Sequence, residues 1–259
     1  MTYSFQDSLL HRTRLLWFSA AVAGQGAFVL MILAFFGRRT VAGNFAGWND
    51  KPHIKAYVAG DAAGNMMYGL HVLLAAIVMA GGLLQLLPAI RRRWPALHRW
   101  NGRLFFSVAG FMAISGLWLT WVRHTYLTVI GGITTSGDAV LILLCVANAW
   151  RLAVARDFAA HRRWALRAFM VVSGVWFLRV GIMGWILVSG GWGMNNQMSG
   201  PADIALQLGC YLIPLALLEV YFRATTKVWA GGLILLATGF MMVGIGGAIT
   251  FMWWPRIIQ

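Results

Sequence analysis

Residues 15–36 read LLWFSAAVAGQGAFVLMILAFF, a run of 22 residues without a charged side chain. An α-helix rises about 1.5 Å per residue, so about 20 apolar residues cross the roughly 30 Å hydrocarbon core of a bilayer. The run is too long for the apolar region of a signal peptide and lacks a convincing small-residue cleavage site. We therefore interpret it as an uncleaved membrane-spanning helix.

The whole chain of 259 residues has the same character: 60% of its residues are hydrophobic, 11% are charged, and its mean hydropathy is +0.71. A soluble domain carries about 25% charged residues, so the composition excludes a soluble globular fold. We predict an all-α, polytopic transmembrane helical bundle that forms a single integral membrane domain over residues 1–259. Its seven spans are Leu15–Phe36, Met66–Ala89, Leu104–Val122, Gly137–Ala155, Trp164–Ser189, Ile204–Phe222 and Val228–Trp254.

The fourth span allows two interpretations because its clean apolar core is short. In the first, the helix begins near Gly137 and Ser136 or Asp138 caps its N-terminus. In the second, it begins near Leu127 and buries Asp138 in the membrane. We favour the first interpretation, since an unpaired carboxylate is costly in lipid.

The 21 basic residues outnumber the 7 acidic ones, for a formal net charge of +14. Their placement at span ends indicates membrane orientation and contact with anionic lipid head groups of the bilayer, with no nucleic-acid partner. One side holds Arg12, Arg14, Arg91, Arg92, Arg93, Arg99, Arg103, Arg151, Arg156, Arg162, Arg163, Arg167, Arg223 and Lys227, the other holds Arg38, Arg39, Lys51, Lys55, Arg123 and Arg256, and Arg179 lies within a span. The positive-inside rule then predicts a cytoplasmic N-terminus and an external C-terminus.

A short motif occurs twice, as Arg-Trp-x-x-Arg at residues 99–103 and 163–167. Each copy follows a histidine and precedes an outgoing span, so spans two–three and four–five are predicted to be repeats of one hairpin. Arginines four residues apart share a helix face and repel each other. An anion would relieve the repulsion: a lipid phosphate, a heme propionate or an acidic group of a substrate. Simple anchoring of the helix ends at the lipid surface is the alternative.

The histidines of this motif, His98 and His161, are expected at similar depth on neighbouring helices. With Arg103 and Arg167 nearby, they form the minimum for a bis-histidine heme b, or a quinone, in a membrane redox protein. Glu219 is the only glutamate in the chain and is expected to form a structural ion pair with Arg103 or Arg167. No metal site is predicted.

A second polar site is predicted toward the outer side of the bundle from His71, Arg179, Tyr68 and Asn65, and Asp203 and Gln207 could join it. An arginine inside the membrane is a functional candidate, and His71 could donate, accept or carry a proton; His71 is also a candidate cofactor-binding residue. The alternative is a buried hydrogen-bond network with a purely structural role. This site favours a small-molecule or lipid carrier as the alternative function. The third hypothesis is a non-catalytic accessory subunit with a membrane-protein partner, or a homo-oligomer, and whether the protein is an enzyme stays open.

Several of these residues resemble a known family. His71, the run Gln85-Leu86-Leu87-Pro88 and the motif His98-Arg99-Trp100-x-Gly102-Arg103 look like the bacterial membrane proteins of domain of unknown function 2306. The later motif at 161–167 and Arg179 are similar to the second half of that family, although Ala165 stands where the family commonly has methionine. The resemblance covers residues 66–189. It implies a multi-pass protein of the bacterial inner (plasma) membrane and carries no established activity.

Overall fold

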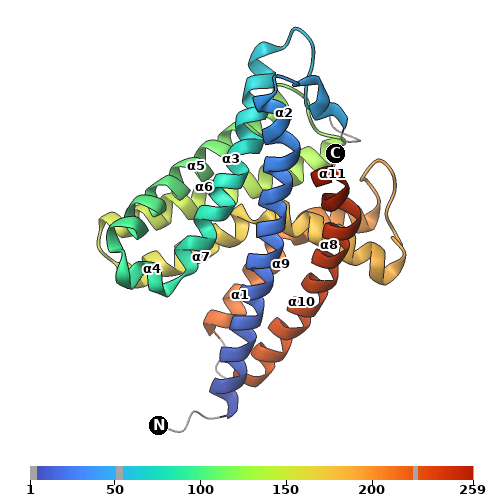
Figure 1. Cartoon of the computed structure of the whole chain (residues 1–259). Helices are drawn as coiled ribbons and strands as arrows, with labels where there is room; N and C mark the ends of the chain where they lie inside the picture. The colour runs from blue at the N-terminus through green and yellow to red at the C-terminus, as the bar shows by residue number, and fades with distance from the viewer. Residues whose placement is uncertain (1–4, 51–54, 224–226, 259) are drawn as a thin grey trace.

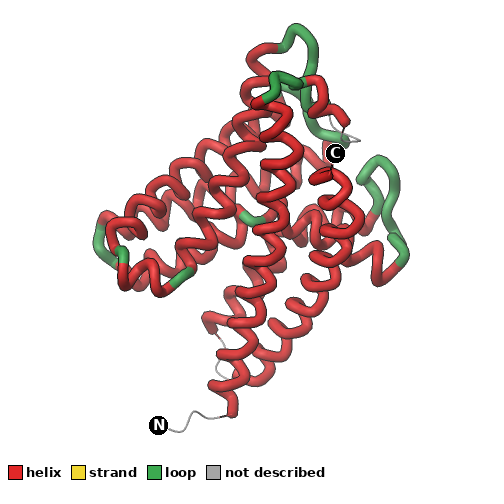
Figure 2. Tube along the Cα trace, in the orientation of Figure 1, coloured by secondary structure: helices red, strands yellow, loops and turns green. Residues whose placement is uncertain are grey.

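The computed structural model describes residues 5–50, 55–223 and 227–258, and all the regular elements in these ranges are helical (Figures 1 and 2). Six helical segments are long and apolar enough to cross a membrane, and a bent pair of shorter helices makes a seventh. The predicted fold class, an all-α membrane bundle, is therefore confirmed.

The α-helices are α1 (Phe5–Ile32), α2 (Arg38–Val41), α3 (Ala62–Leu86), α4 (Pro88–Arg93), α5 (Pro95–Trp121), α6 (Val129–Val154), α7 (Phe158–Val172), α8 (Gly174–Ser189), α9 (Pro201–Arg223), α10 (Lys227–Gly247) and α11 (Trp254–Ile258). Wider π-helical turns at Leu33–Gly37 and Ala248–Trp253 continue α1 into α2 and α10 into α11, so the first and last spans are uninterrupted. A short 3₁₀ helix, Ala46–Asp50, lies in the loop before α3.

The favoured start of the fourth span is wrong, because α6 begins at Val129 rather than near Gly137. The Thr128 hydroxyl accepts the Gly131 N–H at 3.0 Å and so supplies the N-cap about two turns earlier than predicted. Asp138 consequently lies inside the helix, as in the interpretation that we did not favour. Neither Ser136 nor Asp138 caps α6.

The fifth span is two helices rather than one, because α7 and α8 meet at an angle of 52°. The Ser173 N–H bonds the carbonyl oxygens of both Phe169 and Val171, which tightens the last turn of α7. Ser173 and Gly174 form a Ser-Gly pair, one of the local sequences at which helices kink. Since α5 is continuous, the proposed hairpin copies differ here, and the repeat remains a prediction.

Two apolar cores lie on either side of this break. The first is built mainly from α1, α3, α8 and α10, and its buried side chains include Phe28, Trp176 and Trp253. The second is built mainly from α5, α6, α7 and α9 and includes Phe105 and Ala168. In Figure 1, α1 and α10 run side by side, with α4 and the start of α7 far to their left. The α7–α8 break therefore stands at the boundary between two packed groups of helices.

Candidate functional site

The carboxylate of Asp138 on α6 lies directly against the break between α7 and α8. A Cβ atom on Gly174 would come 2.7 Å from Asp138 Oδ2, so a glycine at this position leaves room for the carboxylate. Asp138 Oδ1 is buried and has no hydrogen-bond partner. Gly174 is the first residue of α8, and the start of a helix favours a negative charge. This contact combines an intramembrane ionisable group with an interrupted helix.

Helix α9 brings further polar groups to the same region. Asp203, Gln207 and Tyr211 follow one another at intervals of four residues and therefore lie along one side of the helix. The Thr134 hydroxyl of α6 lies 3.0 Å from Gln207 Oε1, one turn before Asp138. The Tyr211 hydroxyl lies 3.1 Å from the point where a Cβ on Gly137 would stand. A line of polar groups thus follows the contact between α6 and α9 past Asp138.

Pro214 interrupts the backbone hydrogen bonding of α9 one turn beyond Cys210. A proline lacks the N–H that would bond the carbonyl oxygen four residues earlier, so the Cys210 carbonyl loses its helical donor. This carbonyl belongs to the residue preceding Tyr211. The Cys210 carbonyl oxygen is therefore an acceptor without its regular helical N–H donor.

The opposite side of the break is also polar. Gln25 of α1 is fully buried, and its Nε2 donates to Ser173 Oγ at 3.1 Å. Gln25 Oε1 and Trp176 Nε1 are both buried without a hydrogen-bond partner. Such atoms are costly in an apolar surrounding and are ordinarily satisfied by water or a polar solute. Together with Asp138 Oδ1, they make the break the strongest candidate site in the part of the chain that the structure describes.

The residues predicted at the arginine-rich end make specific contacts. His161 Nδ1 lies 2.8 Å from the Ala149 carbonyl oxygen and must therefore donate to it. His98 Nδ1 is buried without a partner, while its carbonyl oxygen accepts from Gln85 Nε2 at 2.8 Å. Whether the two imidazoles share a ligand stays a prediction.

The two arginine motifs share one contact and differ in another. The guanidinium of Arg103 lies 4.7 Å from the ring of Trp100, and that of Arg167 lies 4.8 Å from the ring of Trp164. Glu219 pairs with Arg167 at 2.6 Å and with Arg223 at 3.3 Å. Of the two expected partners of Glu219, Arg167 forms the ion pair. Arg103 instead stacks on Trp100 of its own helix.

The four residues of the predicted intramembrane site make most of their contacts with groups outside it. His71 Nδ1 lies 3.0 Å from Ser115 Oγ, and Arg179 donates to the Val175 carbonyl at 2.8 Å while stacking on Phe28. Tyr68 is buried against Trp48 and Phe36, and Asn65 lies at the start of α3. Arg179 and Tyr68 lie close enough to interact electrostatically, so the predicted site stays a prediction, and Asp138 and Gln25 are polar groups that it did not include.

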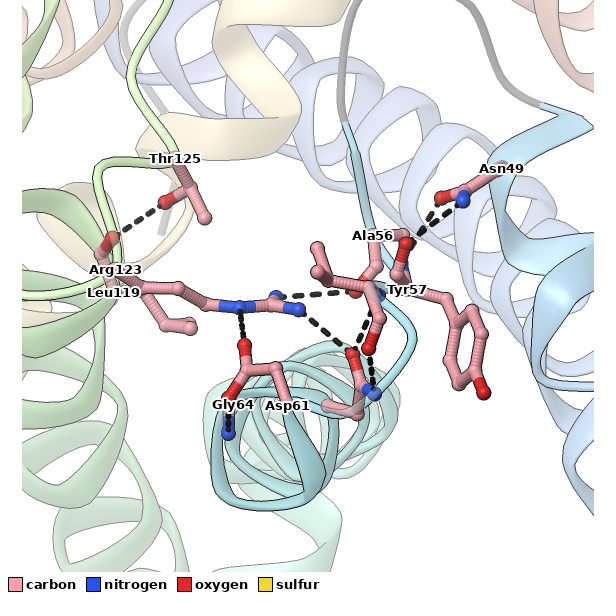
Figure 3. Close-up of polar contacts among 10 residues, drawn as sticks. Asn49, Ala56, Tyr57, Asp61, Gly64, Leu119, Arg123 and Thr125 are labelled. Atoms are coloured by element: carbon pink, nitrogen blue, oxygen red, sulfur yellow. Dashed lines mark hydrogen bonds and ion pairs between the residues drawn. The ribbon is translucent and has the colours of Figure 1, made fainter.

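A clamp formed by Arg123 ties the loop before α3 to the end of α5 (Figure 3). Arg123 Nε donates to Asp61 Oδ2 at 2.8 Å, Nη1 to the Ala56 carbonyl at 3.0 Å and Nη2 to Asn65 Oδ1 at 2.7 Å. Asp61 also caps α3 by accepting the Gly64 N–H. The Gly64 N–H and the Arg123 guanidinium together hold the pKa of Asp61 below its ordinary value of 3.8. A cavity of about 340 Å³ adjoins the clamp and is lined by Lys55 and His124 among others.

Replacing Arg123 with alanine is expected to lower the melting temperature by about 5 °C at neutral pH, because three hydrogen bonds of a side chain that is 6% exposed are lost. Asp61 has a depressed pKa, so its contribution is present above about pH 4 and is lost as pH falls through the lower folded-state value. The difference between wild type and Arg123→Ala should therefore shrink in acid. Thermal unfolding in detergent measures both effects, with the exposed Lys55→Ala as control. Equal melting temperatures at neutral pH would contradict a stabilising clamp.

Six or seven apolar helices with polar groups held between them define a multi-pass integral membrane protein. The family model described as predicted membrane protein (DUF2306) matches residues 67–222, and the chain belongs to this family. The matched region extends beyond the resemblance at residues 66–189 and includes α9 up to Phe222. It contains Asp138, Gly174 and Glu219. No curated protein and no solved structure matches the chain.

Two local signals could have pointed to the break from sequence. One is a carboxylate, Asp138, inside an apolar stretch; the other is the Ser-Gly pair at residues 173–174, about halfway along a predicted span. Neither signal shows that the two features meet, because they lie on different helices. Gln25 carried no comparable signal, since a lone glutamine within a span is as consistent with helix packing as with a site.

Proposed function

We propose that the protein is a membrane carrier whose working site is the α7–α8 break, with Asp138 as its proton-binding group. The observation that carries the proposal is the buried, unpartnered Oδ1 of Asp138 beside the first residue of α8. Ionisable groups within membranes mark proton relays and solute pathways, and interrupted helices line the binding sites of many carriers. The carrier alternative from the sequence is thus retained, with its site moved from His71 and Arg179 to Asp138.

Protonation of Asp138 changes the charge at the contact between the two packed groups of helices. The neutral carboxyl tolerates an apolar surrounding, whereas the carboxylate requires a donor, a cation or water. Each state thus favours a different arrangement of α6 relative to the start of α8. A bundle with two cores and a bend between them can respond by rocking one group of helices against the other. In this way the proton is coupled to movement of a polar solute past the break.

Proton flux into liposomes tests this function without a known solute. Purified protein is reconstituted with a pH-sensitive dye inside, and a pH gradient is imposed with the membrane potential clamped. Wild type is expected to conduct protons above empty liposomes, Asp138→Asn to fall to that background, and Asp138→Glu to retain flux. Asp157→Asn is the matched control, because Asp157 is exposed and caps α7, a role that asparagine also fills. Equal flux in wild type and Asp138→Asn would refute the proposal.

A redox role at His98 and His161, with heme b or a quinone, is a second candidate. Its support is the bond from His161 Nδ1 to the Ala149 carbonyl, which leaves Nε2 as the free ring nitrogen, as in many metal-ligating histidines. A Soret absorption band in the purified protein that disappears in His161→Ala would favour it. A colourless protein without bound quinone would eliminate it. For either function we propose a location in the bacterial inner membrane with the arginine-rich end in the cytoplasm.

A further inference from the structure

Helices α1, α7 and α9 meet at the arginine-rich end around a cluster of guanidinium groups. We propose that this junction binds the phosphate of an anionic phospholipid head group. The cluster comprises Arg167 and Arg223, which pair with Glu219, and Arg14 and Arg163, which contact Tyr221 and Phe222 at the same end of α9. The proposal is independent of the carrier function.

The contacts within the cluster leave positive charge uncompensated. Arg167 binds Glu219 Oε1 through Nε at 2.7 Å and through Nη2 at 2.6 Å, and Arg223 lies 3.3 Å from Oε2. Both carboxylate oxygens are therefore engaged. Two more guanidiniums have neutral partners: Arg14 donates to the Tyr221 hydroxyl at 3.1 Å, and Arg163 lies 5.2 Å from the Phe222 ring centre. Among the side chains that the structure describes, these four arginines at the end of α9 are accompanied by one carboxylate.

Arginine and its surroundings here suit a phosphate attached to acyl chains. A guanidinium presents a planar set of donors that matches phosphate oxygens, and basic pockets between transmembrane helices bind anionic head groups. Arg14 and Arg163 are exposed, and Leu15 and Leu16 next to Arg14 are 54% and 40% exposed. A free phosphate ion makes no favourable contact with this apolar surface, whereas the acyl chain of a phospholipid packs against it. The combination favours a phospholipid over a soluble anion.

The second copy of the sequence motif provides a matched control. Arg99 and Arg103 on α5 are exposed arginines at the same spacing, and Arg103 stacks on Trp100 of its own helix. Among the described residues, neither Arg99 nor Arg103 has an ion pair with a carboxylate or a hydrogen bond to another helix. If arginines at the membrane surface attracted lipid only by their charge, both copies of the motif would bind it equally. A specific site would bind lipid only at the junction of α1, α7 and α9.

Native mass spectrometry and lipid titration of the detergent-purified full chain test the proposal. Wild type is expected to retain phosphatidylglycerol in preference to phosphatidylcholine with identical acyl chains. Arg14→Gln and Arg163→Gln should each weaken binding about fivefold, and the double variant about thirtyfold. The double variant Arg99→Gln with Arg103→Gln should bind like wild type, and melting curves confirm that each variant is folded.

Three results would overturn the proposal. The first is equal retention of the two lipids by wild type, a comparison that requires no variant. The second is an equal loss of binding in the two double variants, which would indicate attraction of lipid by charge alone. The third is inorganic phosphate binding that depends on Arg14 and Arg163 without any lipid preference, which would assign the junction to a free anion.

Discussion

Gly244→Ala is expected to destabilise the bundle by about 3 kcal/mol, which corresponds to a fall of roughly 10 °C in melting temperature. Gly244 lies on α10 where this helix crosses α8. A Cβ atom at this position would overlap the Val180 carbonyl oxygen and come 2.8 Å from Val180 Cγ1. A backbone carbonyl cannot rotate away as a side chain can, so α8 and α10 must separate. This separation would open the first core around Trp176 and Trp253.

Gly246→Ala and Gly239→Ala on the same helix are the controls. A Cβ atom at either position has no neighbour within 4 Å, and alanine favours the helix over glycine by about 1 kcal/mol. These two variants should melt at or above the wild-type temperature. If Gly244→Ala melted with them, close approach of α8 and α10 would not be what holds the first core together.

Asp203→Ala and Asp138→Ala are expected to differ by about 3 kcal/mol in stability although both remove a carboxylate from the bundle. Asp203 is fully buried, and its Oδ2 accepts the N–H groups of Asn195 at 2.9 Å and Gly200 at 3.0 Å. Alanine leaves both donors unsatisfied, so this variant should lose about 3 kcal/mol. Asp138 has no hydrogen bond to lose at Oδ1, and its removal relieves an unsatisfied buried atom. Asp138→Ala should therefore be close to wild type in stability.

Thermal unfolding in one detergent compares the stability of the two variants directly, and the flux assay compares their proton transport. Functional sites commonly contain residues that lower the stability of the fold. Asp138→Ala should thus be stable and inactive. A large loss of stability in Asp138→Ala, equal to that of Asp203→Ala, would instead assign Asp138 a structural role.

Local sequence was sufficient for some features of the candidate site and insufficient for others. An ion pair of Glu219 with Arg103 or Arg167 could be expected in advance, because a lone glutamate near a membrane needs a cation, and only the structure chose Arg167. The start of α6 could not be chosen, because Thr128, Ser136 and Asp138 are all good N-caps by residue type. The choice depends on Gly174 of a distant helix, whose missing side chain leaves space for the Asp138 carboxylate.

The apolar runs by themselves determined that this chain is a multi-pass helical membrane protein. In lipid a backbone has no water to satisfy its polar groups, so an apolar run of this length must form hydrogen bonds within a helix. Only the tertiary structure decided which polar side chains meet: Asp138 with the α7–α8 break, Gln25 with Ser173, and Arg14 with Tyr221. These pairs join residues of different helices, and the apolar pattern of one span contains no information about the face that its neighbour presents.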